Sequence, residues 1–221
     1  MKACIFDLDG TLTDTLSTIA FYANKALEAF GYPSIETEHF KYFAGNGKDM
    51  LIHRALRHLN IDNEENFLKV SSEYDKLYEG NTVGLSKPFD GICEMLDSLK
   101  KMGIKLAVLS NKPHNVTVPL VKNIFGNECF DIIFGQRAEV KMKPDPEGAY
   151  ITANELGVSS DECIFIGDTD NDILTGVNAE MKSIGVLWGF RDEKELTDAG
   201  ADYIVSQPEE IVNIISLLNK N

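Results

Sequence analysis

The chain has 221 residues, 43% of them hydrophobic and 25% charged, and its formal charge at pH 7 is −14. This composition excludes a mostly disordered chain, and the length suits one full domain with an insertion or a small second domain. The acidic excess argues against nucleic acid and anionic membranes as partners, and no apolar run approaches the roughly 18 residues of a membrane span. Scattered cysteines and the lack of an N-terminal signal pattern predict a reducing, cytoplasmic setting.

Short apolar runs bounded by glycine, aspartate or asparagine predict buried parallel strands, because they lack the alternation of a half-exposed strand. They are Ala3–Phe6, Lys105–Leu109, Asp131–Phe134, Cys163–Ile166, Ser183–Leu187 and Tyr203–Val205. Helical patterns lie between them; for example, the one-face spacing of Ile92, Met95 and Leu99 ends at Gly103. This alternation predicts an α/β fold with a doubly wound parallel sheet.

One interval breaks the alternation, because helical stripes follow one another from Leu16 to Tyr78 without a convincing strand. We expect a helical bundle inserted after the first strand, with Gly80–Pro88 as the return linker. The predicted core domain comprises residues 1–15 and 84–221, and the predicted cap domain comprises residues 16–83. Ligands of open α/β sheets bind beyond the carboxyl ends of the strands, so the insert would lie over the site as a lid.

Two aspartates, Asp7 and Asp9, come directly after the predicted strand Ala3–Phe6. They can point into one pocket if the strand breaks at Gly10; the alternative is a surface turn, where aspartate and glycine are common. Paired carboxylates suit a hard cation such as Mg²⁺, and one can serve as a nucleophile while the other serves as an acid and a base.

A second acidic segment, Gly167–Asp172, follows the predicted strand Cys163–Ile166 and contains three aspartates. One of them, Asp168 or Asp170, could cap the helix that follows. A cap needs a single residue, so the surplus of negative charge favours a metal.

Two further strand-end segments carry groups that suit phosphate. Ser110–Lys112 offers a hydroxyl and free backbone N–H groups at a helix start, which can bind an anion or form an ordinary cap. Lys143 leads a segment in which two prolines fix the backbone, with a solvated lysine as the alternative. A metal and this lysine together would let so acidic a protein hold an anion.

In their order along the chain, these segments resemble the motifs of the haloacid dehalogenase superfamily of phosphohydrolases, in the subclass with a helical cap. Asp7–Thr11 is similar to its first motif, Ser110 to its second, Lys143 to its third and Gly167–Asp172 to its fourth. Within the superfamily, the segment Phe43–Leu51 resembles the cap of phosphoglycolate phosphatases. The resemblance covers essentially the whole chain.

The resemblance implies a Mg²⁺-dependent phosphomonoester hydrolase with an aspartyl-phosphate intermediate, and 2-phosphoglycolate as the first substrate to consider. Asp7 would attack phosphorus, and Asp9 would protonate the leaving alkoxide and then activate water. The implied Mg²⁺ ligands are Asp7, the Asp9 carbonyl and Asp168, with Asp172 farther out or acting through water. The implied phosphate-binding residues are Ser110, Asn111, Lys143 and Thr11, the last of which would also orient its loop.

Substrate choice is expected to reside in the cap. The loop of Gly45, Asn46, Gly47 and Lys48 could reach the site, and Lys48 or Arg54 could meet a substrate carboxylate. The alternative for both cations is a solvated helix face.

Other functions share parts of this pattern. A phosphomutase, a pyrophosphatase or a promiscuous phosphatase of the same superfamily would use the same catalytic residues and differ in cap contacts. A signalling receiver domain also phosphorylates an aspartate, but it leaves the insert and the Lys143 segment unexplained. We expect a small phosphorylated metabolite as the ligand, and a monomer or weak homodimer.

Overall fold

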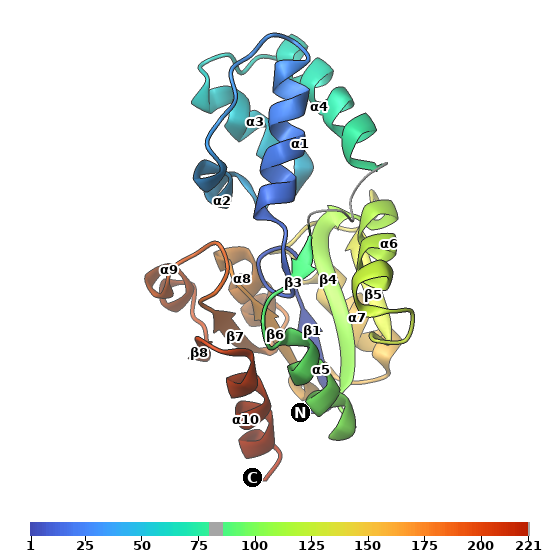
Figure 1. Cartoon of the computed structure of the whole chain (residues 1–221). Helices are drawn as coiled ribbons and strands as arrows, with labels where there is room; N and C mark the ends of the chain where they lie inside the picture. The colour runs from blue at the N-terminus through green and yellow to red at the C-terminus, as the bar shows by residue number, and fades with distance from the viewer. Residues whose placement is uncertain (80–85, 221) are drawn as a thin grey trace.

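The computed structural model describes residues 1–79 and 86–220, and a six-stranded parallel sheet forms its centre (Figure 1). The strands are β1 (Ala3–Phe6), β4 (Lys105–Pro113), β5 (Ile132–Gln136), β6 (Cys163–Gly167), β7 (Lys182–Val186) and β8 (Tyr203–Val205). Their order is β5-β4-β1-β6-β7-β8, so β1 lies between β4 and β6. β4 and β5 lie on one side of β1, and the later strands β6, β7 and β8 lie on the other. The carboxyl end of β1 is therefore a topological switch point.

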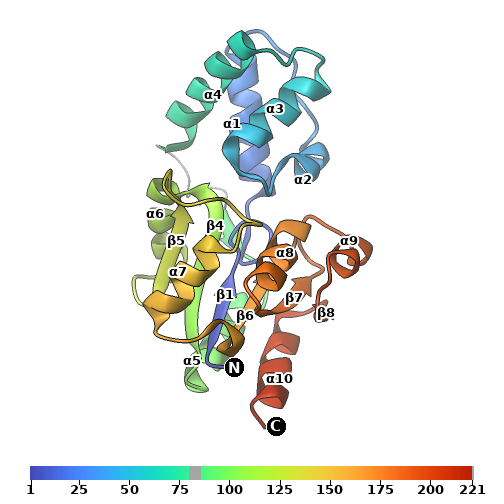
Figure 2. The ribbon, with the colours of Figure 1, turned by 180° about the vertical axis from the view of Figure 1, so that it is seen from behind.

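Helices cover both faces of the sheet (Figures 1 and 2). They are α5 (Ile92–Lys101), α6 (His114–Phe125), α7 (Glu147–Leu156), η2 (Ser160–Glu162), α8 (Asp170–Asn178), α9 (Glu193–Asp198) and α10 (Pro208–Leu218). Cys4 and Phe6 of β1 belong to the core shared with α5, α6 and α10, whereas Ala3 and Ile5 belong to the core shared with α7. Because both faces are buried, these strands read as continuous apolar runs.

The predicted α/β fold is confirmed, and the strands predicted at Ala3–Phe6 and Tyr203–Val205 have the predicted bounds. β4 is longer than predicted: it continues to Pro113, with an irregularity in its pairing to β5 between Ser110 and Pro113. The segment Ser110–Lys112 therefore lies within the last residues of a strand rather than after it. Irregularities of this kind re-aim side chains, here at the end of the sheet that faces the insert.

The segment between β1 and β4 contains a separate group of helices, which Figures 1 and 2 show beyond one end of the sheet. Its elements are α1 (Leu16–Glu28), η1 (Thr37–His39), α2 (Phe40–Phe43), α3 (Gly47–His58) and α4 (Glu64–Glu79). Their apolar stripes pack into a second hydrophobic core, which includes Ala23, Phe40 and Leu56 and is joined by Val116 and Phe190 of the sheet domain. The predicted helical insert is thus present.

Two short strands join the insert to the sheet domain. β2 (Thr13–Asp14) pairs antiparallel with β3 (Lys87–Pro88), so the outgoing and returning chain meet. Pro88 of the predicted linker lies in β3, and Gly80 and Gly84 lie outside the described residues. The predicted domain boundaries themselves stay a prediction.

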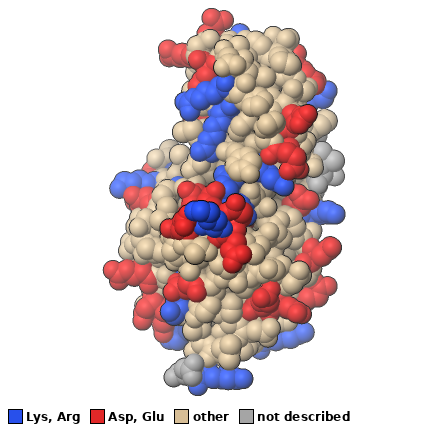
Figure 3. Space-filling model, turned by 90° about the vertical axis from the view of Figure 1, so that its left-hand side faces the viewer, with Lys and Arg blue, Asp and Glu red and all other residues tan. Residues whose placement is uncertain are grey.

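The surface reflects the composition. Figure 3 shows acidic and basic groups intermingled over both the insert and the sheet domain. Within residues 1–79 and 86–220, no helix combines the length and the apolar character that a membrane crossing requires.

Candidate active site

The structure brings the predicted residues of the sheet domain together at one end of the sheet. Asp7 and Asp9 follow β1, Ser110 lies near the end of β4, Asp168 follows β6, and Lys143 precedes α7. These elements are adjacent because β1 pairs with both β4 and β6. Residues that are far apart in the sequence therefore share one site.

Lys143 joins two aspartates in the buried centre of this site. Its Nζ lies 2.7 Å from Asp7 Oδ1 and 2.6 Å from Asp172 Oδ1. Burial raises the pKa of Asp7 to about 7, against the opposing effect of Lys143. Burial lowers the pKa of Lys143, but Asp172 and Asp7 outweigh that effect and raise it above its ordinary value. Lys143 is thus held as a cation among ions that solvent screens little.

Asp168 is held by two donors from neighbouring segments. The Thr11 hydroxyl donates to its Oδ1 at 2.8 Å, and the Phe190 N–H donates to its Oδ2 at 2.8 Å. A Cβ on Gly10 or Gly189 would come to 2.3 Å from an Asp168 atom, so the absence of side chains there makes room for Asp168. Burial, reinforced by neighbouring carboxylates, raises the pKa of Asp168 well above its usual range despite the two donors. The Thr11 hydroxyl thus positions Asp168, and its predicted contact with phosphate stays a prediction.

Three of the predicted metal ligands, Asp7, Asp168 and Asp172, could hold a metal ion. Each offers a carboxylate oxygen, the three oxygens lie within 4.8 Å of one another, and all three residues are buried. Lys143 contacts two of them, so the cluster keeps an excess of negative charge. Such an excess is costly in a buried site, where burial first, and neighbouring carboxylates second, raise the pKa values of Asp7 and Asp168. A hard cation that prefers carboxylate oxygens, such as Mg²⁺, fits this donor set.

The start of α8 combines a helix cap with the ion cluster. The N-cap residue is Thr169, so the alternative in which Asp168 or Asp170 serves as the N-cap residue does not hold. Asp172 accepts through Oδ2 from the Thr169 N–H at 3.0 Å and from its hydroxyl at 2.8 Å, while Oδ1 faces Lys143. One aspartate therefore stabilises both the helix start and the lysine.

Asp9 has a different lysine as its partner. Lys112 Nζ lies 2.8 Å and 3.0 Å from the two carboxylate oxygens of Asp9, and the Lys112 side chain is only 8% exposed. The same ammonium lies 5.1 Å from the ring centre of Tyr78, which belongs to the insert. Sequence reasoning gave Lys112 no role; the available signal was its position at the carboxyl end of β4. Asp7 and Asp9 thus occupy separate electrostatic environments.

Asn111 connects the loops around the site. Its Nδ2 donates to the carbonyls of Gly45, in the insert, and Lys143, both at 3.1 Å. Its Oδ1 accepts from the Lys143 N–H at 2.8 Å. Beside it, the buried Ser110 hydroxyl accepts from the Lys112 N–H at 3.2 Å. The Asn111 side chain is thus occupied in positioning loops, and its predicted contact with phosphate concerns its backbone N–H.

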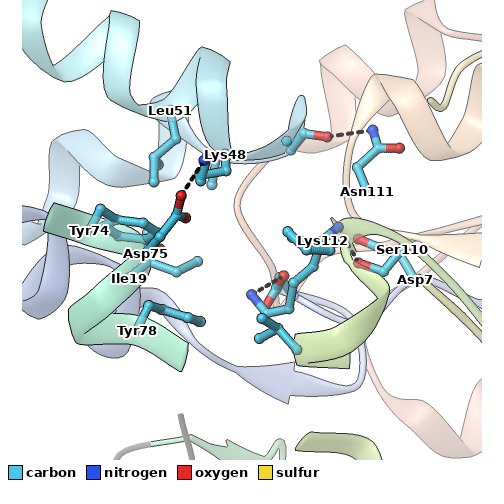
Figure 4. A pocket seen from close by; sticks show the side chains of 16 residues that line it. Asp7, Ile19, Lys48, Leu51, Tyr74, Asp75, Tyr78, Ser110, Asn111 and Lys112 are labelled. Carbon is cyan, nitrogen blue, oxygen red and sulfur yellow. Dashed lines mark hydrogen bonds and ion pairs between the residues drawn. The ribbon is translucent and has the colours of Figure 1, made fainter. Parts of the chain in front are cut away.

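A cavity of about 80 Å³ lies between the sheet domain and the insert (Figure 4), with room for several water molecules at roughly 10–15 Å³ each. The sheet domain and the start of α6 contribute Asp7, Asp9, Ser110, Asn111, Lys112, Pro113 and Val116. The insert contributes Ile19, Ala44, Gly45, Gly47, Lys48, Leu51, Tyr74, Asp75 and Tyr78. The wall from the sheet domain is therefore mostly polar, and the wall from the insert is mostly hydrocarbon.

The predicted cap loop reaches the cavity in part. Gly45, Gly47 and Lys48 line it, and Asn46 does not. Arg54 is also absent from the lining, because its guanidinium donates to the last carbonyls of α2 at 3.2 Å and 3.0 Å. The expectation that Arg54 meets a substrate carboxylate therefore has no support in this arrangement.

Comparisons with known proteins agree on one family. Residues 4–186 match the family described as haloacid dehalogenase-like hydrolase. Phosphoglycolate phosphatase of Vibrio parahaemolyticus is 28% identical over 221 residues, which cover 98% of this chain and 97% of the relative. N-acetylmuramic acid 6-phosphate phosphatase of Pseudomonas aeruginosa is 29% identical over 216 residues, 97% and 95% of the two chains. A solved structure from Lactobacillus delbrueckii subsp. bulgaricus matches with a TM-score of 0.92 and 32% identity, covering 97% and 98%.

Proposed function

The chain belongs to the haloacid dehalogenase-like hydrolase family, and on that premise we propose that it is a Mg²⁺-dependent phosphatase that hydrolyses phosphomonoesters through an aspartyl-phosphate on Asp7. One observation carries the proposal: two carboxylates line the same cavity, and each has its own lysine, Asp7 with Lys143 and Asp9 with Lys112. Two acids in separate environments are what a nucleophile and an acid/base require.

In the first step, an oxygen of the Asp7 carboxylate attacks phosphorus, and the bond from phosphorus to the leaving oxygen breaks. Asp9 enters this step as the carboxylic acid and gives that oxygen its proton, so the alcohol leaves uncharged and Asp9 becomes the carboxylate that pairs with Lys112. Lys143, already 2.7 Å from Asp7, favours the ionised form of the nucleophile against the effect of burial and offsets the charge of a phosphate oxygen. The Ser110 hydroxyl and the Asn111 N–H bind the remaining phosphate oxygens.

In the second step, Asp9 takes a proton from water while that water attacks the aspartyl-phosphate, which releases phosphate and restores Asp7. The proposed Mg²⁺ ligands are the side chains of Asp7 and Asp168 and the carbonyl of Asp9, with Asp172 farther out. When bound, Mg²⁺ would supply positive charge that offsets the negative charge of the phosphoryl oxygens. Thr11 acts through Asp168, whose carboxylate its hydroxyl holds.

We further assign residues 16–83 as the cap and residues 1–15 and 84–221 as the catalytic core. Two hydrophobic cores, of which the second takes only Val116 and Phe190 of its buried members from the sheet domain, and the β2–β3 junction support this division. A small phosphorylated metabolite is the proposed ligand. The name of the Vibrio relative supports 2-phosphoglycolate as one candidate, and that of the Pseudomonas relative supports N-acetylmuramic acid 6-phosphate as another.

The test is phosphate release from a panel of esters, with Mg²⁺ or with EDTA. The panel holds 2-phosphoglycolate, sugar phosphates, pyrophosphate, nucleotides and 4-nitrophenyl phosphate. We expect Mg²⁺-dependent release that EDTA abolishes. Absence of release from every compound would overturn the proposal. Isomerisation of a sugar phosphate without net release, seen only with a bisphosphate activator, would identify a phosphomutase instead.

A further inference from the structure

The insert presents a largely hydrocarbon wall to the cavity. Ile19 of α1, Leu51 of α3, and Tyr74 and Tyr78 of α4 converge on it (Figure 4). The two tyrosine rings stack with their centroids 5.0 Å apart, and both residues are buried. A wall of this kind suits the C–H face of a ligand better than a charged group.

An ion pair interrupts this wall. Lys48 Nζ lies 2.8 Å from Asp75 Oδ2 and 3.5 Å from Asp49 Oδ1. The other lysine of the lining, Lys112, pairs with Asp9. Among the lining residues that the structure describes, each ammonium therefore already has a carboxylate partner. The insert offers no spare positive charge to an anionic ligand within that set.

This pairing of charges determines which leaving alcohols the insert wall can accept. The alcohol part of 2-phosphoglycolate carries a carboxylate, which would have to share the Lys48 ammonium with Asp75 and Asp49. Like charges at such short separations repel, so this leaving group is disfavoured. A hydroxyl can donate to Asp75 and accept from Lys48 at the same time, because it carries both a proton and lone pairs.

We propose that the Lys48–Asp75 pair selects phosphate esters of uncharged polyols, with a sugar as the leaving alcohol, over small carboxylate-bearing esters such as 2-phosphoglycolate. The proposal rests on the phosphatase function proposed above, and it departs from the substrate that the family resemblance suggests. A sugar would place hydroxyls at the ion pair and carbon on the surrounding wall. Asp75 decides the choice because it lines the cavity and lies closer to Lys48 than Asp49 does.

The experiment measures kcat/KM of the full chain with Mg²⁺ for glucose 6-phosphate and 2-phosphoglycolate, with 4-nitrophenyl phosphate as the reference. We expect the unaltered protein to prefer the sugar phosphate by at least about tenfold. In Asp75→Asn, Lys48 loses its nearest carboxylate and can receive that of 2-phosphoglycolate. The ratio of the two kcat/KM values should then shift toward 2-phosphoglycolate by roughly 10- to 100-fold.

Glu73→Gln is the matched control. It removes one negative charge from the same helix, where Glu73 pairs with Lys76 at 3.2 Å, outside the cavity lining. Its ratio should stay within about twofold of that of the unaltered protein. The Asp75 side chain is 44% exposed, so the asparagine variant should fold, and thermal unfolding verifies this.

The outcomes separate the two proposals. A ratio that shifts in Asp75→Asn but not in Glu73→Gln supports selection by the Lys48–Asp75 pair. If 4-nitrophenyl phosphate is hydrolysed but the unaltered protein prefers 2-phosphoglycolate, or Asp75→Asn leaves the ratio unchanged, polyol selection is wrong and the phosphatase function stands. If none of the three esters releases phosphate, the phosphatase function fails, and polyol selection fails with it.

Discussion

The two walls of the cavity hold their charges in different ways. Directly behind the wall of the sheet domain, Lys143 contacts the lining residue Asp7 and forms an ion pair with Asp172, and the Lys143 and Asp172 side chains are 4% and 0% exposed. On the wall of the insert, Lys48 and Asp75 are 23% and 44% exposed. Solvent screens the second pair, and a pair of this kind contributes at most about 1 kcal/mol to stability. Removal of one partner from the first pair leaves a buried charge uncompensated, which costs about 3–5 kcal/mol.

This difference predicts two roles: the sheet wall carries out the reaction, and the insert wall selects the substrate. The buried ions have fixed partners and little solvent, so they can orient and activate a reacting group for any ester that enters. Under the proposed function, the insert wall would contact the alcohol part of the ester, and its exposed ion pair can change partners at low cost. Substitutions on the sheet wall should therefore lower turnover of every substrate, whereas substitutions on the insert wall should redistribute activity among substrates.

The strongest test of the sheet wall is Asp7→Asn. An amide cannot form the aspartyl-phosphate, so phosphate release should fall by at least about 10³-fold for alkyl and aryl phosphates alike. The fold should survive, because Lys143 keeps its contact with Asp172 at 2.6 Å. Steady-state phosphate release and thermal unfolding measure the two effects. Substantial residual turnover in a sequence-verified preparation would remove Asp7 from the nucleophile role.

The residues of the sheet wall could be predicted because their signals are local in the sequence. Asp7, Ser110 and Asp168 each belong to the carboxyl end of a short apolar run, and parallel strands bring such ends to one edge. The role of Lys112 could not be predicted because its partner Asp9 lies 103 residues away, and nothing near Lys112 in the sequence indicates that partner. Their pairing depends on the adjacency of β1 and β4, which is a property of the whole sheet.

The insert wall was harder to predict for a different reason. Tyr74 and Tyr78 belong to an apolar stripe, and the predicted packing of that stripe into the insert's own core is what the structure has. Helical periodicity identifies which face is apolar, but it does not separate core residues from those at the edge of the core that line a cavity. Asp75, next to Tyr74, carried no signal beyond a charge on a helix.

The second prediction asks whether the sheet wall acts on the leaving group. Lys112→Met removes the ammonium that holds Asp9, so proton delivery should suffer most where the leaving oxygen needs a proton. We expect kcat for an alkyl phosphate to fall by about 10²-fold and that for 4-nitrophenyl phosphate to fall much less. Asp9→Asn should show the same division between the two esters. Equal losses for both esters would reduce Lys112 to a structural role.

The third prediction concerns pH and the stability of the metal-free protein. Folding raises the pKa of Asp7 from 3.8 to about 7, so the folded state binds this proton more tightly than the unfolded chain does. The stabilisation is complete below about pH 4 and is lost as pH rises through about 7. Urea unfolding in EDTA should show this loss of stability, and the loss should be smaller in Asp7→Asn, which keeps only the contribution of Asp168. If the free energy of unfolding depends on pH in the same way in both proteins, the burial of ionised Asp7 is not the cause of the loss.

The smallest expected effect tests whether selection is confined to the lining of the insert. Arg54 lies on α3 outside the cavity lining, and its guanidinium binds the last carbonyls of α2. Arg54→Met should therefore destabilise the protein by about 1 kcal/mol, measured by urea unfolding, through lost hydrogen bonds. The ratio of kcat/KM for glucose 6-phosphate and 2-phosphoglycolate should stay unchanged. A selective loss of 2-phosphoglycolate turnover would instead place the Arg54 guanidinium at the substrate carboxylate, so the insert would supply a cation that Asp75 does not neutralise.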